Sequence, residues 1–169
     1  MKRINLFSSI LTLLFLLCSC FNNTPKYCIG ETAPVHEYFQ ATVTTKSTSN
    51  ILEYKDKNNK TQVLETNGKD TFISLNVVIS CNRTTGVSYT FDKDDFKLTD
   101  NLIGSNSVGD IKAFEDYTWI GTKIETAKTV ELSLYFKVSV LVIEEYTYLE
   151  IDFKNSPGNS TKIFLESRE

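Results

Sequence analysis

The sequence predicts an all-β protein, an antiparallel β-sandwich of about seven to nine short strands. Apolar and polar residues alternate over several short segments, with the period of two that is typical of half-buried strands. Polar turns rich in Asn, Asp, Gly and Ser separate these segments. The sequence shows no convincing amphipathic helix, no repeat and no low-complexity tract. Short strands joined by polar turns favour two packed sheets.

The first predicted strand runs from Tyr38 to Ser47 and is rich in β-branched residues. Its apolar face consists of Phe39, Ala41, Val43 and Thr45. Two weaker strands, Ile51 to Tyr54 and Gln62 to Glu65, flank the charged turn from Lys55 to Lys60. This arrangement predicts an exposed hairpin.

The strand from Phe72 to Cys81 is the centre of the predicted fold. Its odd-numbered residues alternate with mostly polar neighbours and share one face, namely Ile73, Leu75, Val77, Ile79 and Cys81. Val87, Tyr89 and Phe91 repeat the pattern after a polar break, and a short segment from Phe96 to Leu98 follows. A strand this apolar must be covered on at least one side by the rest of the chain.

Three further strands are predicted in the C-terminal third. Thr129 to Val138 has the cleanest alternation, with Val130, Leu132, Leu134, Phe136 and Val138 on one face. A short apolar segment from Ser139 to Ile143 follows. Tyr146 to Phe153 alternates again, and the turn from Asn155 to Asn159 leads into a closing strand from Thr161 to Leu165.

The least regular segment runs from Asn101 to Thr126, with a helical turn expected from Ile111 to Tyr117. It is too long for a hairpin turn and too apolar for a disordered linker. We therefore expect it to fold against one end of the sandwich and to present part of Tyr117 or Trp119 outward.

The N-terminus predicts three parts: a lipoprotein signal peptide (1–19), a lipidated cysteine with a short tether (20–26) and the sandwich domain (27–169). Basic Lys2 and Arg3 precede an apolar run that is too short to span a bilayer and fits a secretory signal. The run ends in Leu17-Cys18-Ser19-Cys20, which resembles the lipobox of bacterial lipoproteins. That resemblance implies cleavage before Cys20 and lipid attachment to it. The alternative is an ordinary secretory signal with incidental cysteines.

The net charge of the chain restricts the kinds of partner that it is expected to bind. The chain has 18 basic and 21 acidic residues, a formal charge of −3. The signal peptide contains two of the basic residues and no acid, so 16 basic against 21 acidic residues remain and the charge becomes −5. An acidic domain has no phosphate-neutralising patch, so we expect no nucleic-acid partner. Membrane attachment then depends on the lipid on Cys20.

Few residues suggest catalysis or metal binding. His36 is the only histidine, so neither a two-histidine metal site nor a well-supported Ser-His-Asp triad can be assigned. Asp92, Asp94 and Asp95 cluster in one segment, where the alternatives are a calcium site and a turn whose side chains bind local backbone. We expect no enzyme activity, no metal, no cofactor and no small-molecule substrate.

Cys28 and Cys81 remain as a candidate disulfide pair in a compartment that permits disulfides, with buried free thiols as the alternative.

Aromatic residues are the best candidates for a partner-binding surface. Tyr135, Tyr146 and Tyr148 fall on the polar faces of their predicted strands, and Tyr117 and Trp119 fall in the irregular segment. Tyr and Trp are enriched in binding patches. The competing interpretation is that they support neighbouring strands and cap the core.

The ordered set of motifs resembles a family of bacterial lipoproteins with an immunoglobulin-like domain of unknown function. The fold of this family is like that of a secreted mycobacterial immunoprotective protein. The matching segments are Tyr27-x-Ile29-Gly30-Glu31, Phe72 to Ile79 closing on Asn82, Asp95-Phe96-x-Leu98, Val130 to Val138, Tyr148 to Phe153 and Ile163 to Leu165. Two positions depart from the family: Thr126-Ala127-Lys128 stands where Pro-Gly is usual, and Cys81 replaces a polar residue. The resemblance implies an immunoglobulin-like, extracytoplasmic, non-enzymatic domain.

We therefore expect a lipid-anchored binding module on the extracytoplasmic face of a bacterial cell membrane. Its partner would be a protein or an envelope polymer. The alternatives are a structural accessory lipoprotein of an envelope complex and a secreted hydrolase or inhibitor on a sandwich scaffold.

Overall fold

The structure is a computed structural model that describes residues 27–55, 58, 60–99, 111–112, 123–153 and 160–167. The signal peptide, Cys20, the tether, Tyr117 and Trp119 therefore lie outside the described residues. Within those residues, no helix has the length and hydropathy needed to span a bilayer.

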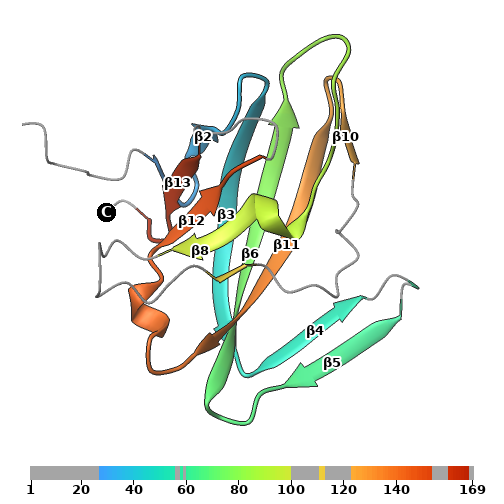
Figure 1. The fold of residues 1–169 in the computed structure, drawn as a ribbon. Helices are drawn as coiled ribbons and strands as arrows, with labels where there is room; N and C mark the ends of the chain where they lie inside the picture. Colours follow the sequence, from blue (N-terminus) through green and yellow to red (C-terminus); the bar gives the residue numbers. More distant parts are fainter. Residues whose placement is uncertain are drawn as a thin grey trace, which may run out of the picture.

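One sheet has four strands in the order β11-β6-β3-β2. Its strands are β2 (Thr32–Pro34), β3 (Phe39–Ser49), β6 (Asp70–Cys81) and β11 (Thr129–Ser139). All neighbours in it are antiparallel. The long strands β3, β6 and β11 form the back of the sandwich in Figure 1.

The second sheet has five shorter strands in the order β1-β13-β12-β8-β9. They are β1 (Tyr27–Cys28), β8 (Phe96–Thr99), β9 (Ile111–Lys112), β12 (Tyr148–Ile151) and β13 (Thr161–Phe164). Only the β1–β13 pair is parallel among the pairs that the structure describes. At one edge the Thr161 hydroxyl donates to the carbonyl of Pro34 at 2.7 Å and so ties β13 to β2.

Two strand pairs lie outside these sheets. β4 (Ile51–Lys55) and β5 (Thr61–Glu65) form the expected hairpin, which projects from the sandwich in Figure 1. β7 (Ser88–Thr90) pairs with β10 (Lys123–Glu125). Two 3₁₀ turns, η2 (Lys93–Asp95) and η4 (Ile143–Glu145), complete the described elements.

The two sheets share one core, which confirms the predicted antiparallel β-sandwich. The alternating apolar residues of β6 and β11 all point into it: Ile73, Leu75, Val77, Ile79, Leu132, Leu134 and Phe136 are at most 1% exposed. Leu98, Leu149 and Ile163 meet them from the five-stranded sheet. Because one shift of register would turn every core residue toward solvent, the pairing of Phe136 with Ile73 and of Leu134 with Leu75 is strongly specified.

The irregular segment differs from the expectation where the structure describes it. Ile111 and Lys112 form strand β9 rather than a helical turn, and Lys123 to Glu125 form strand β10. Both strands are too short to show an alternation of their own, because a period of two needs at least four residues to be seen. Such short strands raise the described total to thirteen, above the seven to nine expected.

Candidate functional site

A pocket of about 180 Å³ lies at one end of the sandwich. Three parts of the chain converge there: the loop between β2 and β3, the loop between β6 and β7, and Phe153, which lies just after β12. The side chains that shape it are His36, Tyr38, Phe39, Arg83, Tyr89 and Phe153.

Three aromatic rings form the floor of the pocket. The ring of Phe39 lies edge-on to that of Phe153 at a centroid distance of 5.3 Å, and Tyr89 lies 4.9 Å from Phe153. Phe39 and Phe153 are almost completely buried, at 3% and 1% exposure. Aromatic pairs at 4.5 to 7 Å are mutually stabilising, so the floor is a fixed surface continuous with the core.

A buried carboxylate holds Tyr89 in place. The Tyr89 hydroxyl donates to Oδ1 of Asp95 at 2.8 Å, and the backbone N–H of Asp92 donates to Oδ2 of the same carboxylate at 2.7 Å. Asp95 is fully buried. The Asp94 N–H in turn donates to Asp92 Oδ1 at 3.0 Å. The acidic cluster therefore forms a turn whose side chains bind local backbone, as one of the two interpretations expected.

The polar rim is built from Tyr38, Arg83 and His36. The guanidinium carbon of Arg83 lies 4.3 Å from the centre of the Tyr38 ring, in cation–π contact. A hydrogen bond with Glu37 raises the pKa of the Tyr38 hydroxyl, with a smaller contribution from desolvation and an opposing one from Arg83. The Tyr38 hydroxyl therefore stays neutral at physiological pH and adds no negative charge to the rim.

The hydrogen bond of His36 indicates the tautomer of its neutral imidazole. The backbone N–H of Tyr38 donates to Nδ1 of His36 at 3.3 Å. Because Nδ1 accepts, the neutral imidazole carries its proton on Nε2. The ring packs against Tyr38 and Phe39, at centroid distances of 5.2 and 5.7 Å. His36 thus presents a hydrogen-bond donor at the rim.

Backbone hydrogen bonds join the loops around the pocket. The N–H of Asn82 donates to the carbonyl of Tyr38 at 2.9 Å, and the N–H of Ala127 donates to the carbonyl of Arg83 at 3.1 Å. The N–H of Cys81 donates to the carbonyl of Lys128 at 2.9 Å. The backbone of the loop that carries Arg83 is therefore held on both sides.

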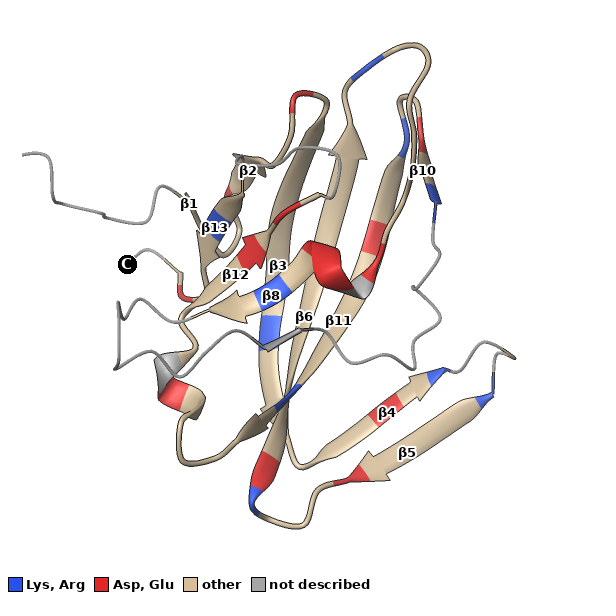
Figure 2. Cartoon of the chain, viewed as in Figure 1, with Lys and Arg blue, Asp and Glu red and all other residues tan. Residues whose placement is uncertain are grey.

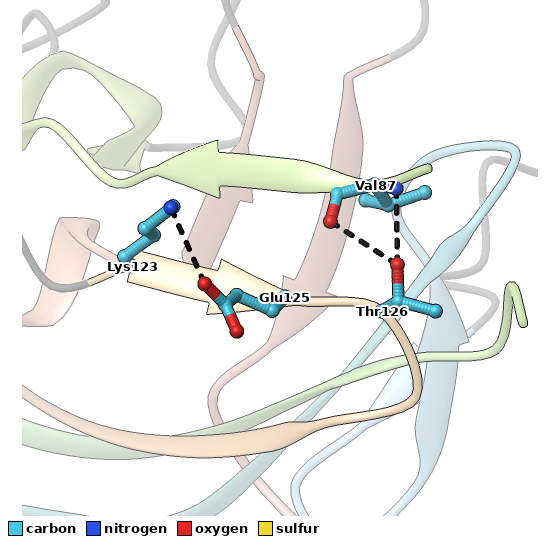
Figure 3. A network of polar contacts seen from close by, with 4 residues as sticks. All are labelled: Val87, Lys123, Glu125 and Thr126. Carbon is cyan, nitrogen blue, oxygen red and sulfur yellow. Dashed lines mark hydrogen bonds and ion pairs between the residues drawn. The ribbon is translucent and has the colours of Figure 1, made fainter. Parts of the chain in front are cut away.

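Val87 lines the pocket and is held by hydrogen bonds to Thr126, which Figure 3 shows. Its hydroxyl oxygen accepts the Val87 N–H at 3.0 Å and donates to the Val87 carbonyl at 3.2 Å. The Thr126 N–H donates to the same carbonyl at 3.1 Å. The neighbouring ion pair of Lys123 and Glu125, at 3.2 Å, is solvent-exposed and adds little stability.

The turn from Thr126 to Lys128, where the resembled family usually has Pro-Gly, is completed by Ala127 in the left-handed region at φ 52°. For an L-residue with a Cβ this conformation costs about 1–2 kcal/mol. The turn is therefore formed at a cost that glycine would avoid.

Ala127→Gly is expected to raise the free energy of unfolding by about 0.5–1 kcal/mol, because relief of the left-handed strain outweighs the extra entropy of unfolded glycine. Urea melts of the parent protein and of the variant measure this change in the free energy of unfolding. Ala33→Gly, at a fully buried strand position, is the matched control and should destabilise. A loss of stability in Ala127→Gly would contradict the strained turn.

The tyrosines predicted to contact a partner lie in different environments. Tyr146 and Tyr148 are buried, at 3% and 6% exposure, which corrects the expectation that they fall on a polar face. Tyr148 packs against Phe164, its direct cross-strand neighbour, at a centroid distance of 5.4 Å. Tyr146 precedes β12 and joins the core. Tyr135 is half-buried and packs against the core.

For the two cysteines, the structure has the second of the two alternatives that the sequence left open. Cys28 and Cys81 are both buried and both free thiols. Cys28 lies in β1 of the five-stranded sheet, whereas Cys81 ends β6 of the four-stranded sheet opposite Phe39. Each behaves as a small apolar side chain of its own sheet.

Charge does not mark out the site. In the view of Figure 2, segments of both signs occur along the described strands, and the η2 turn is acidic. Among the described residues, no group of three or more His, Cys, Asp or Glu side chains could hold a metal ion. The pocket is distinguished instead by its aromatic floor and its single arginine.

Comparison with known proteins gives the fold and no more. No family model matches the chain, and no curated protein matches it. Among solved structures, the yjhA protein of Bacillus subtilis has a TM-score of 0.53 at 14% identity, over 83% of this chain and 99% of that one. An uncharacterised β-sandwich protein from Clostridium difficile 630 has a TM-score of 0.51 at 14% identity, over 86% and 98% of the two chains.

A third similar structure is the candidate lipoprotein ycdA of Bacillus subtilis strain 168, with a TM-score of 0.49 at 18% identity over 83% of this chain. This chain spans 40% of the length of ycdA. At these identities the similarity to yjhA and to the clostridial protein shows a shared β-sandwich, which agrees with the fold described above.

Proposed function

We propose that the protein is a lipid-anchored binding module on the extracytoplasmic face of a bacterial cell membrane, with an immunoglobulin-like sandwich that presents a ligand pocket at one end. The observation that carries the binding role is the preorganised pocket between the loops. Loops held by a rigid sheet scaffold are where such domains place binding residues. A concave, mostly apolar site with a few convergent polar groups is typical of ligand recognition.

A binding role accounts for the pocket better than catalysis does. The only histidine of the chain, His36, uses Nδ1 to accept a backbone N–H and so has no side-chain base or acid oriented on that nitrogen. A general base for nucleophilic catalysis is usually oriented by a third group at that atom. We therefore propose a non-enzymatic role, in which the pocket holds its ligand without transforming it.

Membrane attachment is supported by the sequence from Leu17 to Cys20 and by the apolar run before it. Two acyl chains on the cysteine, usually with a third on its amine, exceed the marginal membrane binding of one chain. The tether of six residues would hold the domain within about 20 Å of the bilayer. A pocket at one end of such a domain would meet partners in the cell envelope.

Cys20→Ala is expected to remove the protein from the membrane fraction, or to leave it as the uncleaved precursor. Cell fractionation with immunoblotting measures both outcomes. Cys18→Ala is the matched control, because it changes a neighbouring cysteine and leaves a small residue at that position of the lipobox. Normal processing and membrane retention of Cys20→Ala would refute the proposed anchor.

Crosslinking on intact cells, followed by identification of the co-purified molecules, tests the binding role. We expect a protein or an envelope polymer that is recovered with the parent protein and lost when Arg83 at the pocket rim is replaced. Equal recovery with and without Arg83 would favour a structural accessory lipoprotein that uses another surface.

A further inference from the structure

The volume of the pocket limits the size of its occupant. Its volume is about 180 Å³. This is below the range of about 300–1,000 Å³ that is typical of pockets for drug-sized ligands. The pocket therefore fits one ring or one branched side chain together with a small polar group.

The floor favours an apolar group. Val87 and Tyr89 are half-buried and offer apolar surface, Phe39 and Phe153 lie almost completely buried behind them, and the Tyr89 hydroxyl already donates to Asp95. A polar group placed on this floor would lose water without gaining a partner, which is costly. An aromatic or branched aliphatic side chain would be stabilised there by burial.

The rim offers hydrogen-bond donors. Arg83 supplies a guanidinium that lies over the Tyr38 ring. His36 supplies Nε2–H, because its Nδ1 accepts the Tyr38 N–H. Ser88 adds a hydroxyl to the lining. Arg83 forms no ion pair with a carboxylate in the part of the chain that the structure describes. A guanidinium beside two donors matches a carboxylate, which accepts bidentate hydrogen bonds from arginine.

One acidic residue opposes this preference and also provides a test. The Glu37 carboxylate interacts with the Tyr38 hydroxyl and raises its pKa, so it is close to the rim without lining the pocket. Its negative charge should weaken anion binding. Glu37 is exposed, so solvent screens much of the repulsion.

We propose that the pocket binds a carboxylate next to an apolar side chain, the chemistry found at the C-terminal residue of a peptide and in small apolar amino acids. The apolar group lies on the aromatic floor, and the carboxylate pairs with Arg83 at the rim. This ligand class depends on the proposed binding function. It does not depend on the lipid anchor, because the pocket is formed by described residues of the sandwich alone.

The test uses full-length protein purified in detergent and N-acetyl-L-phenylalanine as the probe, with N-acetyl-L-phenylalaninamide as the uncharged match. Nuclear magnetic resonance titration follows the backbone amides of Arg83, Val87 and Ser88. We expect the acid to shift these amides and to bind at least tenfold more tightly than the amide. Equal affinities of acid and amide, or no shift at the pocket with either probe, would overturn the proposal.

Arg83→Gln is expected to weaken binding of the acid about tenfold and to leave binding of the amide unchanged, because only the charged hydrogen bonds are lost. The melting temperature should stay the same, since the Arg83 side chain is exposed. Lys97→Gln on β8 is the control cation and should not change the affinity. Glu37→Gln should strengthen binding of the acid. Unchanged binding of the acid by folded Arg83→Gln would refute the role of Arg83.

Two sources share this chemistry, and a tetrapeptide ending in Phe distinguishes them. Tighter binding of the peptide than of N-acetyl-L-phenylalanine would support the proposal with a peptide C-terminus as the ligand. Equal binding would support it with a free apolar acid. Tight binding of the C-terminally amidated peptide would contradict it. Loss of membrane attachment in Cys20→Ala with binding retained would separate the anchor from the pocket.

Discussion

Phe136→Ala is expected to lower the free energy of unfolding by about 3–5 kcal/mol, because truncation removes a buried aromatic ring and leaves a cavity. Phe136 is fully buried in β11 and pairs with Ile73 of β6. β6 is an inner strand of the four-stranded sheet and β11 is its edge strand, but the Phe136 ring lies in the close-packed core, where little can move to fill the space. Urea melts monitored by circular dichroism measure the change.

Glu131→Ala is the matched control for Phe136→Ala. Glu131 lies on the same strand but is exposed, and its truncation should change stability by no more than about 0.5 kcal/mol. A loss below about 1 kcal/mol for Phe136→Ala would mean that the register of β11 on β6 is wrong. The comparison therefore tests the pairing on which the core depends.

The long strands of the fold were predictable from sequence because a period of two persists along them. β6 and β11 each extend over more than ten residues, and their alternation identifies the buried face directly. Each pairs with a strand that shows the same pattern, so local preference and tertiary packing agree. The β4–β5 hairpin was predictable for a different reason, namely the charged turn from Lys55 to Lys60 between two short segments.

The shorter strands were not predictable, because their pairing is set by distant residues. β10 exists through its register with β7, where Ile124 faces Tyr89. β1 pairs in parallel with β13 from the opposite end of the described chain. A segment of two or three residues has no period, and such contacts are fixed only when the whole sandwich closes.

The buried tyrosines show a limit of alternation as a predictor. Tyr148 lies on the face that sequence assigned to solvent, yet Phe164 on the neighbouring strand covers it. Cross-strand aromatic pairs can bury each other without a second sheet. The alternation predicts a strand that begins at Tyr146, whereas the Tyr146 N–H donates to the carbonyl of Ile143 in a turn. The strand begins only at Tyr148.

The pocket could not be predicted, because its residues come from three separated regions of the chain. His36 and Tyr38 are close in sequence, but Arg83 and Phe153 join them only through the topology. The sequence did contain one weak signal, since Arg83 is an isolated cation in a polar break between two apolar strands. Which ring it meets depends on the hydrogen bonds between the loops.

Asp95→Ala is expected to lower the free energy of unfolding by about 3–5 kcal/mol. The fully buried carboxylate accepts hydrogen bonds from the Tyr89 hydroxyl and the Asp92 N–H. Hydrogen bonds to a charged group contribute about 1.5–3 kcal/mol each, and removing the acceptor leaves both donors without this partner. The backbone bonds of Asp95 to Asp92 and Asp152 persist in the variant, so the effect isolates the side chain.

Tyr89→Phe and the double variant distinguish this network from simple loss of packing. Tyr89→Phe removes one of the two donors and should cost about 1.5–3 kcal/mol. Because the two residues share a hydrogen bond, the double variant should cost at least about 1 kcal/mol less than the sum of the single variants. Strict additivity, or a cost below about 1 kcal/mol for Asp95→Ala, would contradict the network. Since Tyr89 is part of the pocket floor, the same variants connect the stability of the η2 turn to the shape of the candidate binding site.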